Sequence, residues 1–161
     1  MAKLIDFIGN IYVRAADLLN WFKSPLLLAI RLYWGWQFAQ SGWGKLHHLD
    51  RVTEFFQSLN IPAPHANAML VALVEFIGGI LLALGLGSRA VSLILFANMS
   101  VAFLTADRDA VGQIFSDPGK FYGADPYTFW FAALVILVFG AGRISLDRVL
   151  GRVASGAEDP D

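Results

Sequence analysis

Glu75 lies in the middle of an apolar stretch, residues 68–86, that is long enough to cross a lipid bilayer as a helix. An ionised carboxylate in hydrocarbon costs free energy, so it needs a partner of opposite charge or must stay protonated. A second apolar stretch, residues 26–36, contains Arg31. The sequence therefore predicts a buried ion pair between Arg31 and Glu75.

The composition points to a membrane protein of one domain. Of the 161 residues, 57% are hydrophobic and 16% are charged, which is more apolar surface than a soluble fold of this length hides. The net charge of -1 and the lack of a basic stripe argue against binding of nucleic acid. The chain has no cysteine, which excludes disulfides, thiolate metal sites and Fe–S clusters.

Apolar segments of nearly membrane-spanning length occur four times along the chain. They are residues 25–46, 67–86, 88–106 and 127–141. Pro25 suits the first turn of the first segment, and Ser88 suits the N-cap of the third. We therefore predict an all-α fold, in which a four-helix transmembrane bundle forms the domain of residues 25–150.

The flanking segments differ from the predicted bundle. In residues 1–24, apolar side chains recur at helical spacing between charged ones, which predicts an amphipathic helix lying in the membrane interface. An amphipathic helix packed on soluble protein is the alternative. The pattern of residues 52–59 predicts a short amphipathic helix. The small and acidic composition of residues 151–161 predicts a disordered tail.

The distribution of basic residues predicts the orientation in the membrane. One side would carry Lys3, Arg14, Lys23, Arg89, Arg143, Arg148 and Arg152, and the other Lys45, Arg51, Arg108 and Lys120. Because seven basic residues face four, we expect both termini in the cytoplasm and a multi-pass protein of the cytoplasmic (inner) membrane.

Polar residues in the spans are expected to form a layer. At about 1.5 Å of rise per residue, Glu75, Asn98 and Gln37 fall at one level near the middle of the membrane, with Arg31 about one and a half turns away. Such a layer has two interpretations. It is either a structural ion pair that fixes how the helices meet, or a pocket for a small-molecule head group with Glu75 as proton donor or acceptor.

Small residues spaced by four allow membrane helices to approach closely. Gly35 and Ala39 follow Arg31 at this spacing, and Gly79 and Ala83 follow Glu75. In an antiparallel pair we expect Gly79 opposite Arg31 and Gly35 opposite Glu75. Trp34 could add a stacking surface for a planar ring.

All three histidines fall in or beside the first segment between spans. They are His47, His48 and His65. Adjacent histidines on a helix point about 100° apart and seldom chelate together. We therefore predict no metal site, and keep a Cu or Zn site at these three residues as the minor alternative.

Four motifs, in this order and spacing, resemble the DoxX family of small four-helix integral membrane proteins. They are R-x-x-x-G from Arg31, S-G-W-G-K-L over 41–46, E-F-I-G-G-I-L-L-A-L-G-L over 75–86 with Arg89 after it, and G-A-G-R-I-S-L-D over 140–147. The resemblance covers residues 31–150. The resemblance implies a bacterial or archaeal membrane subunit. In that family some members take part in quinone-linked oxidation of sulfur compounds, and others belong to oxidative-stress complexes. In the last motif, Ser145 suits the N-cap of a short cytoplasmic helix and Asp147 its positive end.

The leading functional hypothesis is a membrane subunit of a quinone-linked oxidoreductase system. Arg31, Gln37, Glu75, Asn98 and Trp34 would hold the quinone, and Glu75 would exchange protons with it. We expect no covalent cofactor, so a soluble or membrane oxidoreductase partner or a diffusible reductant would supply the electrons. The alternatives are a non-catalytic scaffold, in which Arg31 and Glu75 only fasten helices, and a small transporter, which would require a homodimer.

Overall fold

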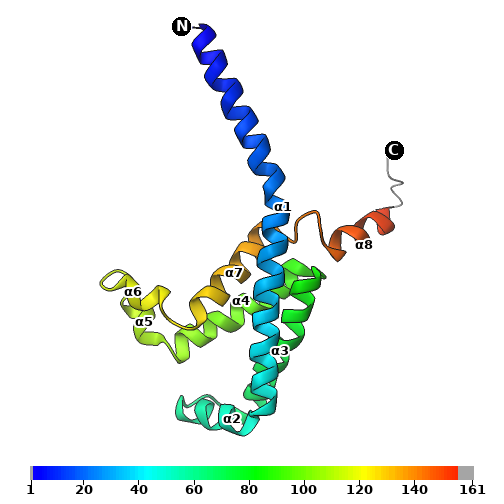
Figure 1. The fold of residues 1–161 in the computed structure, drawn as a ribbon. Helices are drawn as coiled ribbons and strands as arrows, with labels where there is room; N and C mark the ends of the chain where they lie inside the picture. Colours follow the sequence, from blue (N-terminus) through cyan, green and yellow to red (C-terminus); the bar gives the residue numbers. More distant parts are fainter. Residues whose placement is uncertain (1, 156–161) are drawn as a thin grey trace.

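The computed structural model describes residues 2–155, and this part of the chain is helical with short connections (Figure 1). The helices are α1 (Ala2–His47), α2 (Leu49–Ser58), α3 (Pro64–Leu84), α4 (Ser88–Thr105), α5 (Arg108–Gly112), α6 (Pro118–Tyr122), α7 (Pro126–Phe139) and α8 (Leu146–Ser155). The predicted all-α class is confirmed. The predicted helix at residues 52–59 is α2, which begins three residues earlier.

The longest helix, α1, contradicts the predicted break between an interfacial helix and the first span. Its 46 residues form one helix with Pro25 inside it. A proline removes only one backbone hydrogen bond, and a long helix with ordered turns on both sides tolerates this. The N-terminal half of α1 extends away from the other helices (Figure 1). Pro25 therefore does not begin a new helix, and the start of the first span at this residue stays a prediction.

Helices α1 and α3 pack antiparallel with their backbones in contact. A Cβ atom on Gly79 would fall 2.4 Å from the backbone nitrogen of Ala39, and one on Gly42 would fall 2.3 Å from that of Phe76. Neither position has room for a side chain. The predicted close approach through small residues is confirmed, and it fixes the axial position of α1 relative to α3.

The core lies where α1 and α3 meet α4 and α7. Its buried residues are Phe38, Leu82, Val91, Leu95, Met99, Ala133 and Ile136. The indole Nε1 of Trp130 on α7 donates to Ser100 Oγ on α4 at 3.0 Å. This hydrogen bond satisfies a polar group of α7, whose sequence is otherwise almost entirely apolar.

Two helices in the described part of the chain, α3 and α4, are long and apolar enough to cross a membrane. α7 has 14 residues, or about 21 Å of helix, against a hydrocarbon core of about 30 Å. The apolar part of α1 is diluted by Trp, Gln, Ser and Gly. The all-α fold with two candidate spans is therefore shown, and the crossing of all four helices stays a prediction.

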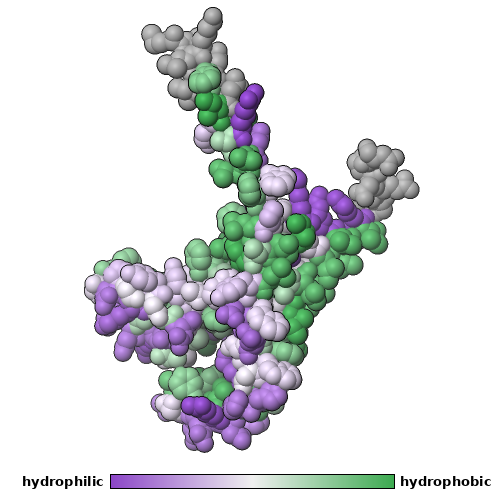
Figure 2. All heavy atoms as spheres, viewed as in Figure 1, coloured by the Kyte–Doolittle hydropathy of each residue, from purple (hydrophilic) through white to green (hydrophobic). Residues whose placement is uncertain are grey.

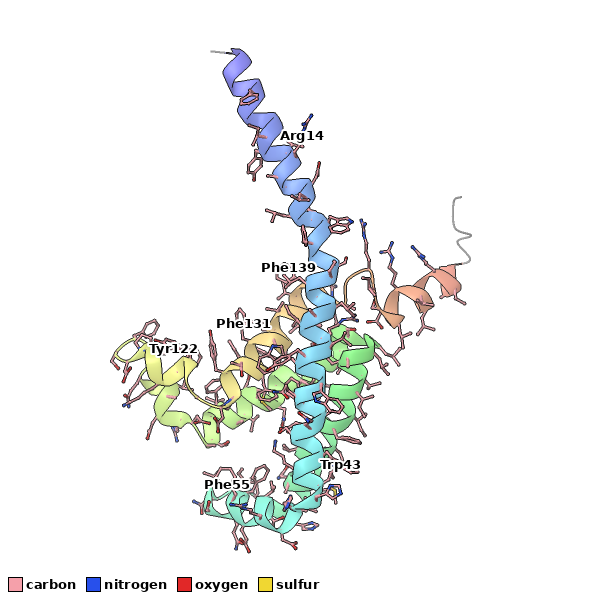
Figure 3. The ribbon with its side chains drawn as sticks, viewed as in Figure 1. Arg14, Trp43, Phe55, Tyr122, Phe131 and Phe139 are labelled. Atoms are coloured by element: carbon pink, nitrogen blue, oxygen red, sulfur yellow. The ribbon has the colours of Figure 1, made fainter. Side chains whose placement is uncertain are left out.

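Large apolar side chains cover the outside of the bundle. Exposed examples are Leu70, Leu73, Ile77, Ile80 and Leu84 on α3, Leu93, Ile94, Val101 and Leu104 on α4, and Phe131, Val138 and Phe139 on α7. Phe131 and Phe139 are labelled in Figure 3, and Figure 2 shows the hydrophobic surface on one side of the bundle. An apolar surface of this extent is typical of contact with lipid.

The C-terminal prediction is partly wrong. Residues 151–155 belong to α8 and are helical, not part of a disordered tail. The rest of the predicted acidic tail, residues 156–161, lies outside the described residues. Helix α8 forms because Ser145 caps it, as predicted: the backbone N–H of Arg148 donates to Ser145 Oγ at 3.3 Å.

Candidate functional site

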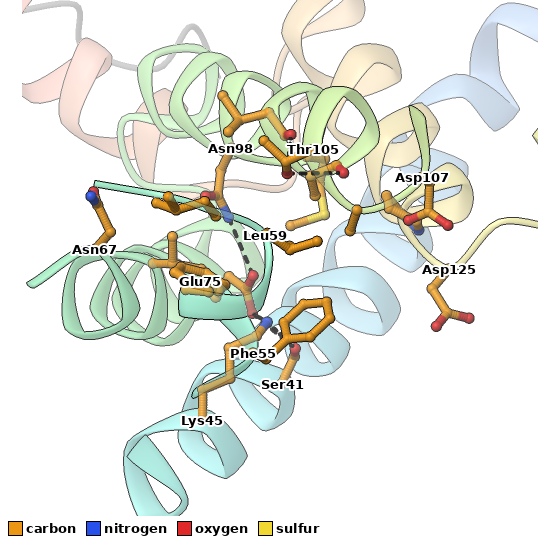
Figure 4. Close-up of a pocket in the computed structure, with 18 of the residues that line it drawn as sticks. Ser41, Lys45, Phe55, Leu59, Asn67, Glu75, Asn98, Thr105, Asp107 and Asp125 are labelled. Atoms are coloured by element: carbon orange, nitrogen blue, oxygen red, sulfur yellow. Dashed lines mark hydrogen bonds and ion pairs between the residues drawn. The ribbon is translucent and has the colours of Figure 1, made fainter. Parts of the chain in front are cut away.

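Glu75 is the centre of a polar cluster inside the bundle (Figure 4). Its side chain is 2% exposed. Oε2 accepts a hydrogen bond from Ser41 Oγ at 2.8 Å and forms an ion pair with Lys45, while Oε1 accepts from Asn98 Nδ2 at 3.2 Å. Both oxygens of the buried carboxylate are thus engaged, by side chains from α1 and α4.

The cluster depends on how α1 presents Lys45. One turn apart on the same helix, Lys45 Nζ donates to Ser41 Oγ at 3.0 Å, so the two side chains approach Glu75 together. The Lys45 side chain is 28% exposed. The ion pair therefore has one fully buried member and one member that still reaches water or a ligand.

A cavity of about 410 Å³ opens from this cluster. Ser41, Lys45, Glu75 and Asn98 form its polar end (Figure 4). Its apolar lining comes from α2, α3, α4, α7 and the segments that follow α2 and α4: Phe55, Phe56, Leu59, Ile61, Val71, Met99, Val101, Ala102, Ala106, Pro126 and Phe129. An apolar chamber with a few polar groups at one end is the usual form of a small-molecule site.

Polar side chains also line the other part of the cavity: Asn67, Thr105, Asp107 and Asp125. Asp107 follows the C-terminal end of α4, and Asp125 directly precedes the first residue of α7. Both therefore lie in the connection between α4 and α7, outside these two helices. Burial, and then the negative charge of Asp125, raise the pKa of Asp107 above its usual value. Asp107 therefore keeps its proton to a higher pH than an ordinary aspartate does.

The predicted ion pair between Arg31 and Glu75 is wrong. Glu75 is paired with Lys45, and Arg31 Nη2 instead donates to the backbone oxygen of Ile144. The residue on α1 that meets Glu75 is Ser41, which is ten residues, or about 15 Å of helix, beyond Arg31. Arg31 is thus too far along α1 to reach Glu75.

The ion-pair prediction fails because it assumes the wrong register of α1 relative to α3. The predicted register has Gly35 opposite Glu75, but a Cβ atom on Gly35 would lie 2.7 Å from Gly79 O and 2.7 Å from the Ala83 nitrogen. The small residues thus meet one another, and the charged side chains lie on either side of that contact. Steric fit between the two backbones sets this register, and charge attraction does not override it.

Arg31 belongs to a second buried cluster, at the C-terminal end of α3, whereas Glu75 lies near the middle of that helix. Arg31 is 1% exposed, and a Cβ atom on Gly85 would fall 1.7 Å from Arg31 Nη1. Gly85 also has a φ of +71°, a conformation that glycine adopts without strain. Within the described residues, Nε and Nη1 of Arg31 make no hydrogen bond.

Asp147 completes this second cluster. Its carboxylate accepts hydrogen bonds from the backbone N–H groups of Gly87 at 2.6 Å and Ser88 at 2.9 Å, and its own N–H donates to Gly85 O at 2.9 Å. Asp147 therefore caps α4. The predicted N-cap role of Ser88 is wrong, because Gly87 holds that position and no side chain within α4 caps the helix.

The pKa of Asp147 reflects these contacts. Burial raises it, but the hydrogen bonds from Ser88 and Gly87 and the positive charge of Arg31 lower it by more, so the pKa lies below its usual value. Asp147 is therefore ionised over the whole neutral range and carries the charge that suits the N-terminus of α4.

The remaining candidate residues lie outside the cavity lining. Trp34 packs edge-to-face on Phe129 with ring centroids 5.1 Å apart, so it supports a lining residue from behind. Gln37 is half-buried on α1 and is not part of the lining. Of the predicted set, the structure brings together only Glu75 and Asn98.

The three histidines are not gathered into a metal site. His47 Nδ1 is 2.9 Å from Trp43 O, and His48 Nδ1 is 3.0 Å from Gly44 O, so both rings are engaged with backbone carbonyl oxygens of α1. Among the described residues, no group of three or more His, Cys, Asp or Glu side chains is placed to hold a metal ion. The minor alternative of a Cu or Zn site is therefore not supported.

The sequence does not predict that Lys45 and Ser41 contact Glu75, because Lys45 lies near the end of its apolar segment and is counted there among the basic residues outside the membrane. A helical projection reveals the position of Lys45 on α1. From position 31 to position 45 a helix turns about 1400°, which leaves Lys45 only about 40° from the direction of Arg31. Lys45 is thus on the face that packs against α3.

The chain belongs to the DoxX family, since a model of that family matches residues 26–108, which are 83 of the 161 residues. The match contains all four residues of the polar end of the cavity. With α3 and α4 as candidate spans, the chain is a DoxX-family membrane protein. No curated protein and no solved structure matches it.

Proposed function

We propose that the protein is a membrane subunit that binds a quinone, or a similar apolar ring compound with polar substituents, in the cavity beside Glu75. The observation that carries the proposal is the cavity of about 410 Å³, which has a mostly apolar lining and at one end a buried carboxylate with an ammonium, a hydroxyl and an amide. An oxidoreductase partner or a diffusible reductant would supply and take up the electrons.

The donors and acceptors at the polar end match the ring of a quinone. Lys45 and Asn98 carry N–H groups that can donate to a quinone carbonyl oxygen, and Ser41 carries a hydroxyl. Glu75 can accept the proton of a bound hydroquinone hydroxyl, which is general-base chemistry at a defined atom. The rings of Phe55, Phe56 and Phe129 in the lining offer apolar surface to the carbocycle.

A bound quinone would supply two-electron redox chemistry, and the chain would position it and move its proton. Because Lys45 is 28% exposed and Glu75 is 2% exposed, the ammonium is the member of the pair that can turn toward a ligand. When it does so, Glu75 keeps its hydrogen bonds to Ser41 and Asn98. This leaves a carboxylate oriented for proton transfer.

The test is quinone binding by the purified full chain in lipid nanodiscs, with a short-chain quinone titrated by calorimetry. We expect saturable binding that weakens roughly tenfold in Glu75→Gln, the loss expected for a hydrogen bond to a charged group. The matched control is Glu54→Gln on α2, an exposed residue outside the cavity, which should bind as the unmodified protein does.

Two results would contradict the proposal: no saturable binding by the unmodified protein, or equal affinity in both variants. The first would favour a scaffold, for which there is also a structural argument. Both Glu75 oxygens already have partners, so the Lys45–Glu75 pair can serve as a fastener between α1 and α3. For a scaffold, Glu75→Gln should lower the unfolding temperature and reduce recovery of a partner protein.

A further inference from the structure

Helix α8 has two chemically different faces. Its apolar side chains lie on one side and are 40–76% exposed: Leu146, Val149, Leu150 and Val153. Arg148, Gly151 and Arg152 fall on the other side at 100° per residue. A short helix with a lipophilic face and arginines opposite is typical of a segment that lies flat in a membrane interface.

The position of α8 agrees with an interfacial location. Asp147, in its first turn, is hydrogen-bonded to Gly87 and Ser88, at the turn where α3 ends and α4 begins. The start of α8 is therefore held at the end of both candidate spans. In Figure 2 the hydrophobic surface of the bundle continues onto the underside of α8, while hydrophilic residues lie above it.

Two arginines line a hollow beside this helix. The hollow measures about 370 Å³, and its lining includes Arg89 from α4, Arg148 from α8 and the backbone around Gly140 and Gly142. Among the described residues of the lining, the one carboxylate is that of Asp147, and it already accepts hydrogen bonds from two backbone N–H groups. With two guanidinium groups against one occupied carboxylate, the hollow suits an anion at the level of lipid head groups.

We propose that α8 lies in the head-group layer of the membrane, with its apolar face against the acyl chains, and that Arg89 and Arg148 bind the phosphate of an anionic phospholipid. The proposal does not depend on quinone binding, since this site lies beyond the C-terminal end of α3 and shares no lining residue with the cavity at Glu75. It adds a lipid surface as the partner of α8 and a phosphate as the ligand of the hollow.

The first test measures the depth of α8 in the full chain in nanodiscs. Because the chain has no cysteine, single cysteines can be spin-labelled without background. The matched pair is Leu150→Cys on the apolar face and Gly151→Cys on the polar face, where a Cβ atom meets no atom within 4 Å. We expect the label at 150 to be relaxed by oxygen and the label at 151 by a water-soluble nickel complex. Equal exposure of both labels to the nickel complex would overturn the interfacial location.

The second test measures lipid selectivity. A fluorophore on Leu150→Cys is quenched by brominated phosphatidylglycerol or by brominated phosphatidylcholine in otherwise identical vesicles. We expect quenching to favour the anionic lipid at least about fivefold, the factor that corresponds to about 1 kcal/mol for one basic residue at an anionic surface. The preference should disappear when Arg89→Gln and Arg148→Gln are combined, and persist when Arg51→Gln and Arg108→Gln are combined.

Three outcomes of the second test would overturn the phosphate site. They are no preference in the parent protein, a preference that survives the Arg89 and Arg148 changes, and a preference abolished equally by the Arg51 and Arg108 changes. Adding inorganic phosphate separates the two sources of the anion. Loss of the preference at millimolar phosphate would show a site for free phosphate and contradict a lipid site, while an unchanged preference would support it.

Discussion

Two cations of α1, Arg31 and Lys45, lie on the side that packs against α3, and their surroundings differ. Arg31 is 1% exposed and donates to a backbone oxygen, that of Ile144, beside a glycine turn. Lys45 has a 28% exposed side chain and is paired with Glu75 at the end of a cavity. Both lie on nearly the same side of α1, about 21 Å apart along the helix.

The difference is in what satisfies each charge. The Arg31 end is closed by the main chain at Ile144 O and at the turn of Gly85, and by the Asp147 carboxylate, which is itself held by two backbone N–H groups at the start of α4. The Glu75 end is built from side chains, which can change rotamer when a ligand enters. Backbone groups hold elements in place, whereas side chains around a cavity provide a surface for recognition. We therefore assign structure to the Arg31 end and ligand binding to the Glu75 end.

Lys45→Met should have the largest effect. It leaves the Glu75 carboxylate buried without its cation, and we expect a loss of about 2 kcal/mol in the free energy of unfolding, somewhat below the range for fully buried pairs because Lys45 is partly exposed. Denaturant unfolding in detergent micelles measures this. Adding Glu75→Gln should restore most of the loss. A double variant as unstable as Lys45→Met would refute an ion-pair origin.

Arg31→Met should cost less, about 1 kcal/mol. It removes the hydrogen bond to Ile144 O, but it also removes two buried nitrogen atoms, Nε and Nη1, that have no partner in the described part of the chain. Quinone affinity should stay unchanged, since the site is about 15 Å away along α1. A binding loss as large as that of Glu75→Gln would break the proposed division between the two ends.

Asp147→Asn should cost about 1 kcal/mol at neutral pH, because asparagine keeps one acceptor oxygen but loses the second hydrogen bond and the negative charge at the N-terminus of α4. The folded-state pKa of Asp147 is lowered, so its contribution is present above the unfolded pKa and lost as the pH falls through the folded pKa. The two unfolding curves should therefore converge below about pH 4. A gap that stays constant with pH would show that the charge is not involved.

Much of the fold was predictable, because apolar runs and turn residues mark helices directly. The turn at Gly85 and Gly87, the spans around it and the capping role of Ser145 follow from local chemistry. The meeting of Glu75 with Asn98 also followed from counting residues along two helices joined by a tight turn. A short connection fixes the level of its two helices relative to each other.

The partner of Glu75 was not predictable in the same way. Residues 48–63 separate α1 from α3, so no tight turn sets their register, and assigning the start of the first span to Pro25 shifted α1 against α3. The contact of Gly35, Gly42 and Gly79 decides that register, because no side chain fits at any of these three positions. Asp147 was missed as the cap of α4 because 59 residues separate it from Ser88.

Asp107→Asn should have the smallest effect and the opposite sign from Asp147→Asn. Burial and Asp125 raise the pKa of Asp107 in the folded state, so the folded protein binds this proton more tightly than the unfolded chain does. Ionised Asp107 is therefore destabilising above its folded pKa, and the asparagine variant should unfold at a slightly higher temperature at pH 7 but not at pH 3. The experiment compares melting temperatures of the two proteins over this range, with Asp109→Asn on α5 as the exposed control. A variant that is less stable at pH 7 would mean that ionised Asp107 makes a stabilising contact in the cavity. Asp107 and Asp125 would then belong to the ligand-binding surface together with Glu75.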